Sequence, residues 1–390
     1  MKNSKNPTRR LIIIAFAAFL LSFLLTQLLF HFLPSGIVTD KEYEERVRSL
    51  LGQIISVYPK IRNLTVPNNI NLKIVSREWV IENWGKPSVQ QRQKVIIDEV
   101  IFKSLLLIDE NYNLSKFLLS WSGMILSATC GYDLYIVRDF FDPNSPNAKR
   151  TLAHEITHIV QFHYFHPPQR ETFDGKQALS ALIEGDADLT ADLFVNLSQS
   201  SSSLDGSVPK ELLMLWSFPY DYGRGFVAFL YSIGGWKLVN QAYSSPPETT
   251  EQVIHPEKYL KNELFKIPDV KINETNWNIL RTDRMGEYFI YVLIFKWCGE
   301  EVAESASSGW NGDILVVGSN SSHYLVYWRI CWDSANDAKE FFDAFCASCS
   351  KAGGLLVKSS DNFQSWIIGR KVIVVSINQD ITTIKSYFKQ

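Results

Sequence analysis

The sequence predicts an α+β fold with a transmembrane helix at the N-terminus, a mainly helical domain with a small β-sheet, and a small α+β domain at the C-terminus. Three observations support this class. Residues 11–33 are almost wholly apolar, residues 40–268 are dominated by apolar side chains at helical spacing, and the pattern changes near residue 276 to short runs typical of strands. About 350 of the 390 residues follow the N-terminal segment. Because one compact core seldom holds so many, we expect two folded units, residues 40–268 and 275–390.

The N-terminal segment combines a basic start with a long apolar run. Four basic residues precede residues 11–33: Lys2, Lys5, Arg9 and Arg10. As a helix the run would be about 34 Å long, enough to cross a bilayer. Acidic residues follow it, which favours residues 1–10 in the cytoplasm and the rest of a single-pass protein outside the cell membrane. A cleaved signal peptide is the alternative, although no clear small-x-small cleavage site follows the run.

The composition is that of an ordinary globular protein. Hydrophobic residues make up 46% and charged residues 21%, and the net charge is −2. No basic patch indicates a nucleic-acid partner, so we expect none. Five cysteines are too few for a disulfide scaffold in a chain of this length, although a single bridge such as Cys298 to Cys331 stays open. Nothing in the sequence determines an oligomeric state.

The first half of the larger unit alternates between helical and strand patterns. Residues 42–58 have helical spacing, residues 71–75 form a short strand pattern, and Ser88 opens a further helix that extends to about residue 107. Residues 131–137 then form a β-rich run directly before the next helix.

That next helix carries two imidazoles and a carboxylate in the stretch 151–161, Thr-Leu-Ala-His-Glu-Ile-Thr-His-Ile-Val-Gln. His154 and His158 are four residues apart, so they share one helix face and can both reach one Zn²⁺ ion at about 2.0–2.1 Å. Glu155 is about 100° further round, better placed to hold a water molecule beside the metal than to bind the ion. Ser145 and Pro146 predict the start of this helix, and an apolar stripe predicts that it is buried.

A third ligand is needed, and a helix over residues 179–192 offers one. Residue 164 is Tyr, which excludes a third histidine six residues after the second. Glu184 lies on or beside an apolar stripe, where a bare carboxylate would cost several kcal/mol unless a metal or a cation compensated it. Asp188, one turn further on, could accept the second ring N–H of a ligating histidine. Gly185 would leave room for the first helix or the metal. The alternative is an acidic helix face with a packing glycine.

The pair of motifs resembles a known family of enzymes. His154-Glu-x-x-His158, followed 26 residues later by Glu184-Gly-x-Ala-Asp188, is similar to the gluzincin group of thermolysin-like zinc metallopeptidases. The resemblance covers about residues 95–265. It implies that His154, His158 and Glu184 bind zinc, that Glu155 is the general base, and that Asp188 supports a ligand. It also implies that the strand over residues 131–137 is a sheet edge with which an extended peptide substrate pairs.

A second resemblance extends toward the C-terminus. Residues 250–259, Thr-Glu-Gln-Val-Ile-His-Pro-Glu-Lys-Tyr, are similar to segments of largely uncharacterised prokaryotic membrane-anchored proteins that also carry both metal motifs, and the likeness continues through residues 309–313. A tetrahedral oxyanion beside zinc needs a hydrogen-bond donor. The candidates are Tyr220, Tyr222, Arg224 and His255. Each could equally be a structural residue with a hydrogen-bonded side chain.

The C-terminal unit shows strand patterns and one amphipathic helix. Strands are predicted at residues 288–296, 314–317, 324–332, 365–368 and 372–377. Residues 334–347, with Asp333 or Ser334 as the N-cap, form a helix that would cover one sheet face. This unit contains no catalytic constellation, and we expect an accessory domain.

The sequence therefore predicts a membrane-anchored zinc metallopeptidase, with Zn²⁺ as cofactor and a peptide or protein as substrate. Two alternatives stay open. One is a zincin-fold protein that keeps the metal but acts as a binding or assembly factor at the outer membrane surface. The other is a metal-free structural protein in which an acidic helix meets two core histidines.

Overall fold

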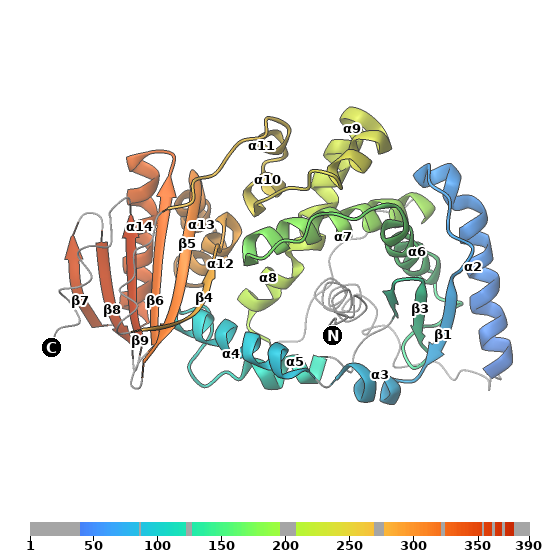
Figure 1. Ribbon diagram of the computed structural model, residues 1–390, viewed down its shortest axis with the longest axis horizontal. Coiled ribbons are helices and arrows are strands. Elements are labelled where there is room, and N and C mark those ends of the chain that lie inside the picture. Colours follow the sequence, from blue (N-terminus) through green and yellow to red (C-terminus); the bar gives the residue numbers. More distant parts are fainter. Residues whose placement is uncertain are drawn as a thin grey trace, which may run out of the picture.

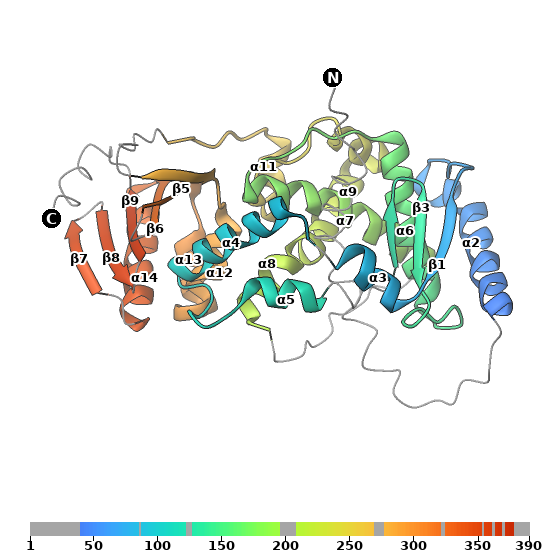
Figure 2. The same ribbon diagram turned by 60° about the horizontal axis from the view of Figure 1, so that its bottom comes forward.

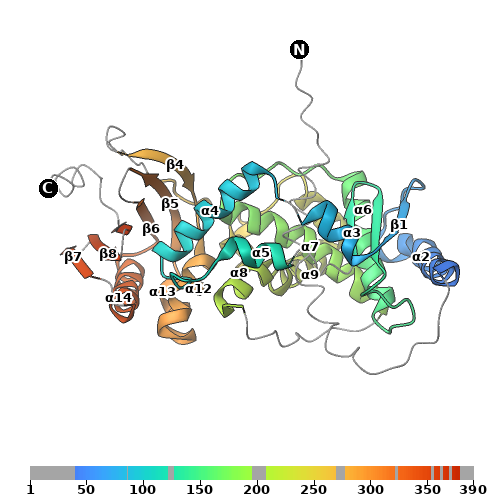
Figure 3. The ribbon, with the colours of Figure 1, turned by 90° about the horizontal axis from the view of Figure 1, so that it is seen from below.

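The computed structural model describes residues 40–85, 87–121, 127–195, 208–268, 277–320, 324–352, 355–360, 363–368 and 371–377. The molecule is elongated, with a three-stranded sheet at one end, a six-stranded sheet at the other and helices between them (Figure 1). Helices α3 to α5 form a row along one side of the molecule (Figures 2 and 3). This mixture of helices and two sheets agrees with the α+β part of the predicted class.

The transmembrane part of the prediction requires a correction. In the part of the chain that the structure describes, no helix combines the length and the apolar character that crossing a bilayer requires. The predicted fold class with an N-terminal transmembrane helix, and the single-pass membrane location derived from it, are contradicted by this finding. The segments that were expected as cytoplasmic N-terminus and anchor, residues 1–10 and 11–33, lie outside the described residues.

The smaller sheet corrects one expectation about substrate binding. After α2 (Asp40–Arg62) it contains β1 (Asn71–Val75), β2 (Ser127–Cys130) and β3 (Asp133–Val137). Their order is β1-β3-β2, with β1 parallel and β2 antiparallel to β3. The strand expected at residues 131–137 therefore lies in the middle of the sheet, and the edge strands on its two sides are β1 and β2. The predictions of a helix over residues 42–58 and a strand over 71–75 are confirmed.

Helices α3 (Arg77–Trp84), α4 (Val89–Ser104) and α5 (Leu114–Trp121) connect β1 to β2. Ser88 caps α4 as predicted, because its hydroxyl accepts from the Gln91 N–H while the Gln91 side chain accepts from the Ser88 N–H. Two N–H groups that a helix start leaves without partners are thus satisfied.

Four helices form the centre of the molecule: α6 (Ala148–Tyr164), α7 (Phe173–Val195), α8 (Lys210–Asp221) and α9 (Gly223–Ala242). The apolar stripe of α6 packs on the smaller sheet and α2, in a cluster that includes Leu134, Ile136 and Ile156. The predicted start of α6 is wrong by two residues. Ser145 and Pro146 lie in a turn before the helix, in which the Ser145 carbonyl accepts from the Ala148 N–H.

Helices α7 and α9 approach each other at two glycines. A Cβ atom on Gly185 would lie 2.1 Å from the Gly223 carbonyl oxygen, and one on Gly223 would lie 2.2 Å from the Ala181 carbonyl oxygen. Both distances are far below van der Waals contact. Gly185 therefore makes room for the first turn of α9, and not for α6 or a metal as the sequence suggested.

The C-terminal part begins after α10 (Thr250–Ile254) and α11 (Pro256–Leu260). Its sheet has the order β4-β5-β6-β9-β8-β7. The strands are β4 (Asn278–Asp283), β5 (Trp310–Ser319), β6 (Tyr324–Trp332), β7 (Leu355–Ser360), β8 (Phe363–Ile368) and β9 (Lys371–Ile377). The helices are α12 (Glu287–Cys298), α13 (Glu300–Ser307) and α14 (Ala335–Lys351). Four predicted strands coincide with β5, β6, β8 and β9, and Ser334 caps α14 as predicted.

The predicted strand over residues 288–296 is wrong, because this segment is the helix α12. The helix is buried on several sides, and its apolar residues do not leave a polar stripe that would reveal helical spacing. Its aromatic side chains join the C-terminal part to the helical centre. Phe289 stacks on Phe102 of α4 with 6.1 Å between ring centroids, and the ring centroids of Tyr288 and Phe218 of α8 are 4.5 Å apart. Both parts of the chain therefore share one hydrophobic cluster.

The two C-terminal sequence motifs meet at the start of α7. Asp174 accepts hydrogen bonds from the Thr250 N–H and hydroxyl, both at 2.7 Å, and from Arg284 Nε at 2.9 Å. The buried carboxylate of Asp313 accepts from two backbone N–H groups and two indoles, those of Met285, Gly286, Trp310 and Trp328. These motif residues hold the beginning of α7 against the C-terminal sheet.

Replacing Gly185 with Ala tests the glycine contact. We expect the free energy of unfolding to fall by about 1–3 kcal/mol or more, because the new methyl group meets backbone atoms that cannot rotate away. Gly52→Ala on α2 is the matched control. Its Cβ would meet nothing within 4 Å, so stability should rise by about 0.5–1 kcal/mol. Urea unfolding followed by circular dichroism measures both, and a Gly185→Ala protein as stable as the parent would contradict the contact.

Candidate metal centre

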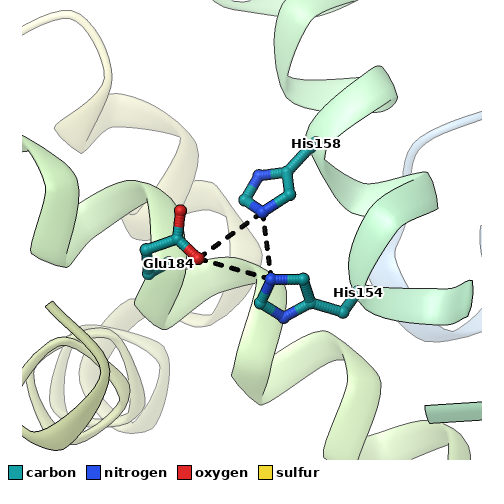
Figure 4. A group of neighbouring side chains, drawn as sticks. All are labelled: His154, His158 and Glu184. Atoms are coloured by element: carbon teal, nitrogen blue, oxygen red, sulfur yellow. Dashed lines mark hydrogen bonds and ion pairs between the residues drawn. The ribbon is translucent and has the colours of Figure 1, made fainter. Parts of the chain in front are cut away.

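Two facing helices bring the predicted metal ligands together. His154 and His158 lie one turn apart on α6, and Glu184 faces them from α7, which runs antiparallel to α6 (Figure 4). The two Nε2 atoms are 3.0 Å apart, and Glu184 Oε2 lies 3.3 Å from the first and 3.5 Å from the second. Ligand atoms of a tetrahedral zinc site with bonds of about 2.0–2.1 Å are separated by about 3.3 Å. His154, His158 and Glu184 thus form a largely buried group that could hold a metal ion.

The hydrogen bonds behind the two imidazoles determine where their protons lie. His154 Nδ1 is 3.1 Å from Asp188 Oδ1, and His158 Nδ1 is 2.9 Å from Gln161 Oε1. A carboxylate and an amide oxygen accept hydrogen bonds, so each Nδ1 must carry the proton that it donates. Neutral imidazoles then keep a lone pair on each Nε2. These lone pairs converge with the Glu184 carboxylate.

Glu184 is the member of the group that most needs a cation. Its side chain is 0% exposed, and neither carboxylate oxygen accepts a well-formed hydrogen bond from the described residues. No lysine or arginine in the described part of the chain pairs with it; its ion-pair partners there are His154 and His158. A proton can be shared between only two of the three converging atoms, whereas a metal ion can bind all three at once. The donor set therefore fits a metal ion.

Asp188 lies behind His154, and Arg150 holds it there. Arg150 Nη2 donates to Asp188 Oδ1 at 2.8 Å, and Arg150 Nε donates to Asp192 Oδ1 at 2.8 Å. Arg224 donates to the other oxygen of Asp192. The Arg224 side chain, which the sequence offered as an oxyanion donor, thus contributes to the charge balance of α7.

Glu155 faces the edge strand β2. Its Oε1 accepts a hydrogen bond from Ser127 Oγ at 2.8 Å, while Oε2 has no hydrogen-bond partner among the described residues. The side chain is 1% exposed, and this burial raises the pKa of Glu155. One carboxylate oxygen is therefore held in place, and the other, Oε2, is buried with unused hydrogen-bonding capacity.

Tyr220 is the candidate donor that the structure brings to the ligand group. Its hydroxyl is buried close to Glu184, without a well-formed hydrogen bond to the described residues. Burial raises the pKa of Tyr220 well above its ordinary value, and the negative charge of Glu184 adds to the effect. The phenol therefore keeps its proton and can donate it in a hydrogen bond.

The other two candidates interact with the C-terminal part of the chain. The Tyr222 ring packs on Phe218 and Tyr288, with 5.1 Å between centroids in each case. His255 Nε2 lies 3.2 Å from Glu287 Oε1, at the N-terminus of α12. The structure thus brings neither of them into the group around His154.

Several residues that support the ligands were missed by sequence reasoning: Arg62, Ser127, Arg150, Gln161, Asp186, Asp192 and Tyr243. Gln161 could have been found, because it lies three residues after His158 and so on the same helix face. Asp186 lies between Glu184 and Asp188 in the sequence, but its side chain bonds to Arg62 and Tyr243 instead. The others come from different elements, and no local pattern marks them.

The charges of the group determine its protonation when no metal is bound. Burial alone would lower the pKa of His154, but its close contacts with the carboxylates of Asp188 and Glu184 outweigh it and raise that pKa to about 10. Burial would raise the pKa of Glu184, but the charge of His158 and the close contacts with both imidazoles lower it to about 2. Near neutral pH, a proton on His154 then occupies the place that a metal would take.

Two protein families match parts of the chain. Residues 126–163 match a family described as the eCIS core domain, and this stretch contains His154, Glu155 and His158. Residues 277–384 match a domain of unknown function, DUF8575. Each match covers well under half of the chain. Neither description names a gluzincin, so that resemblance stays a prediction.

A solved structure with partial likeness is described as "Crystal structure of a putative hydrolase with a novel fold from Chloroflexus aurantiacus". It is 14% identical, and the similarity covers 64% of this chain and 96% of that chain with a TM-score of 0.36. A TM-score of this size supports no conclusion about fold or activity. No curated protein matches the chain.

The protonation of His154 predicts how metal affinity depends on pH. Because its pKa is raised to about 10, the metal-free site holds a proton between pH 6 and 8, and a metal ion must displace it. Each released proton should weaken binding about tenfold for every unit that the pH falls. Zinc titrations of the metal-free protein across this range measure the dependence, and calorimetry in two buffers with different ionisation enthalpies counts the protons. A dissociation constant that does not change with pH would contradict the prediction.

Proposed function

We propose that the chain is a zinc-dependent metallopeptidase of the gluzincin type, which hydrolyses peptide bonds in a peptide or protein substrate. One observation carries the proposal: His154 Nε2, His158 Nε2 and the Glu184 carboxylate converge at spacings of 3.0, 3.3 and 3.5 Å, with Glu155 on the adjoining position of α6. The match of residues 126–163 to the eCIS core domain includes this motif but names no reaction.

The donor set supports zinc as the metal. Two neutral imidazoles and one carboxylate are typical ligands of catalytic zinc sites, which keep one further position for water or substrate. Oxygen-rich surroundings would favour magnesium or calcium, and thiolates would favour softer metals. The three described ligands include neither thiolates nor a cage of oxygens.

The residues around the group support separate roles for zinc, Glu155 and Tyr220 in hydrolysis. When bound, zinc supplies a Lewis acid that polarises a carbonyl group and lowers the pKa of water. Glu155 would take a proton from the attacking water through Oε2 and later deliver it to the leaving amine. Ser127 fixes the other oxygen of Glu155, and the raised pKa makes this carboxylate a better proton acceptor near neutral pH. The Tyr220 hydroxyl would stabilise the tetrahedral oxyanion by donating a hydrogen bond.

The edge strand β2 supports an extended peptide as the substrate. In the described residues β2 pairs with β3 on one side, and no described strand pairs with its other side. An extended peptide can add to such an edge through backbone hydrogen bonds. Ser127 belongs to β2 and contacts Glu155, so a peptide on this edge would lie close to the general base.

The burial of the ligand group supports a second candidate function. The side chains of His154, His158 and Glu184 are 5%, 17% and 0% exposed, and closed zinc sites are more often structural than catalytic. In this alternative the chain keeps the metal but acts as a binding or assembly factor. The two candidates make different predictions for peptide cleavage by the zinc-loaded protein.

Replacing Glu155 with Gln separates the candidates. The variant should still bind zinc, since the three ligands are intact, while kcat for peptide cleavage should fall by about 10²–10⁴-fold because the general base is lost. Glu257→Gln, at an exposed position on α11, is the matched control and should change neither property. Zinc content and cleavage of a panel of unfolded proteins are measured on the same preparations.

The outcomes differ for each hypothesis. Undiminished cleavage by the Glu155→Gln variant would refute the mechanism. A zinc-loaded parent protein that cuts nothing in the panel would favour the binding or assembly factor. A parent protein that takes up no metal at all would favour a purely structural role for the two histidines.

A further inference from the structure

We propose that Gln161 is a positioning residue for the metal group, which orients His158 through a buried chain of hydrogen bonds that begins at Arg62. The inference rests on the proposed zinc site and adds residues outside the two sequence motifs to it. The chain runs from Arg62 on α2 through Asp186 on α7 to Gln161 on α6, and it ends at the imidazole of His158.

Gln161 determines both the tautomer and the direction of the second histidine. Its amide nitrogen donates to the Ile183 carbonyl at 2.9 Å and to Asp186 Oδ2 at 3.3 Å. Because both of these partners are acceptors, the NH₂ group must lie on their side and Oε1 must face His158. Oε1 then accepts the Nδ1 proton of His158 at 2.9 Å. The lone pair of His158 Nε2 is thereby directed toward His154 and Glu184.

Asp186 is held so firmly that it can act as a fixed reference for Gln161. Arg62 binds its carboxylate in a bidentate manner, with Nε at 2.8 Å and Nη2 at 3.0 Å, and the Tyr243 hydroxyl donates to it at 2.7 Å. Arg62 and Asp186 are both 0% exposed. The guanidinium also lies over the Trp236 ring, 4.2 Å from its centroid. Bidentate pairs of this kind fix geometry as well as charge.

The two histidines are supported by different chemistry. His154 donates to the charged carboxylate of Asp188, which makes its imidazole a stronger electron donor to a metal. His158 donates to the neutral amide of Gln161. Gln161 therefore acts mainly by orienting the His158 ring. Loss of the amide should change metal binding even though all three ligands remain.

Zinc affinity of the full-length protein tests this role. In Gln161→Leu the acceptor for His158 and both donors are lost, and the Kd for Zn²⁺, measured by competition with a chromophoric chelator, should rise about 10–100-fold. Gln252→Leu is the matched control. Gln252 is a buried glutamine, 5% exposed, whose amide accepts from the Glu248 N–H and donates to the Glu263 carbonyl, and it has no part in the metal group. It should lower stability in a comparable way and leave the Kd unchanged.

A second variant and a spectroscopic measurement complete the test. Gln161→Glu keeps an acceptor of the same size but cannot donate to Ile183 or Asp186, and its charge faces that of Asp186. Because the variant loses both donors, its side chain is no longer fixed against His158, so the Kd should rise despite the added negative charge beside the imidazole. The same criteria apply to this variant if Gln161→Leu does not fold. The visible spectrum of the Co²⁺-loaded protein should change in both Gln161 variants but not in Gln252→Leu, since it reports ligand geometry.

The possible failures are distinguishable. If the parent protein binds zinc and the Gln161 variants show the same Kd and the same cobalt spectrum, the positioning role is refuted and the proposed function survives. A Gln252→Leu protein that loses affinity to the same extent would show that general destabilisation is the cause, and this too refutes the role. A parent protein without zinc affinity would overturn both proposals.

Discussion

The structure depends on one electrostatic constraint, the burial of a row of carboxylates on helix α7. Burying a carboxylate costs several kcal/mol unless a cation compensates it. Most of the acidic side chains of α7 have an arginine partner: Asp174 pairs with Arg284, Asp186 with Arg62, Asp188 with Arg150, and Asp192 with Arg150 and Arg224. Glu184 is the exception in the described part of the chain. It faces the two imidazoles of His154 and His158 instead, and these three residues form a group that could hold a metal ion.

The arginine pairs also explain why the ligands have fixed directions. Each histidine donates its Nδ1 proton to a group that is itself anchored, since Arg150 holds Asp188 behind His154 and Asp186 holds Gln161 behind His158. A preformed set of directed lone pairs binds a metal without the cost of ordering flexible side chains. The support comes from four helices, α2, α6, α7 and α9. A local change in any of these helices can therefore alter the geometry of the metal group.

The sequence revealed the parts of the site that obey local rules. The spacing of His154 and His158 is one helical turn, and Glu184 lies beside an apolar stripe, so both features can be recognised within a single helix. Arg62 and Tyr243 reach Asp186 from 124 and 57 residues away, and no periodicity marks such contacts. The same reason explains the main error in the fold. The buried helix α12 lacks a polar face and resembles a strand, whereas α14 has a cap and an amphipathic stripe and was recognised.

One residue from each C-terminal motif, Thr250 and Asp313, acts on the site from a distance. Glu184 meets the two imidazoles only in one register of α7 against α6, because a shift of one residue along a helix moves a side chain by about 1.5 Å and turns it by about 100°. The bonds from Thr250 and Arg284 to Asp174 fix the first turn of α7, and Arg62 fixes its middle at Asp186. Asp313 in turn secures the loop next to Arg284 through the Met285 and Gly286 N–H groups. The C-terminal sheet thus serves as an anchor that helps to determine where Glu184 lies.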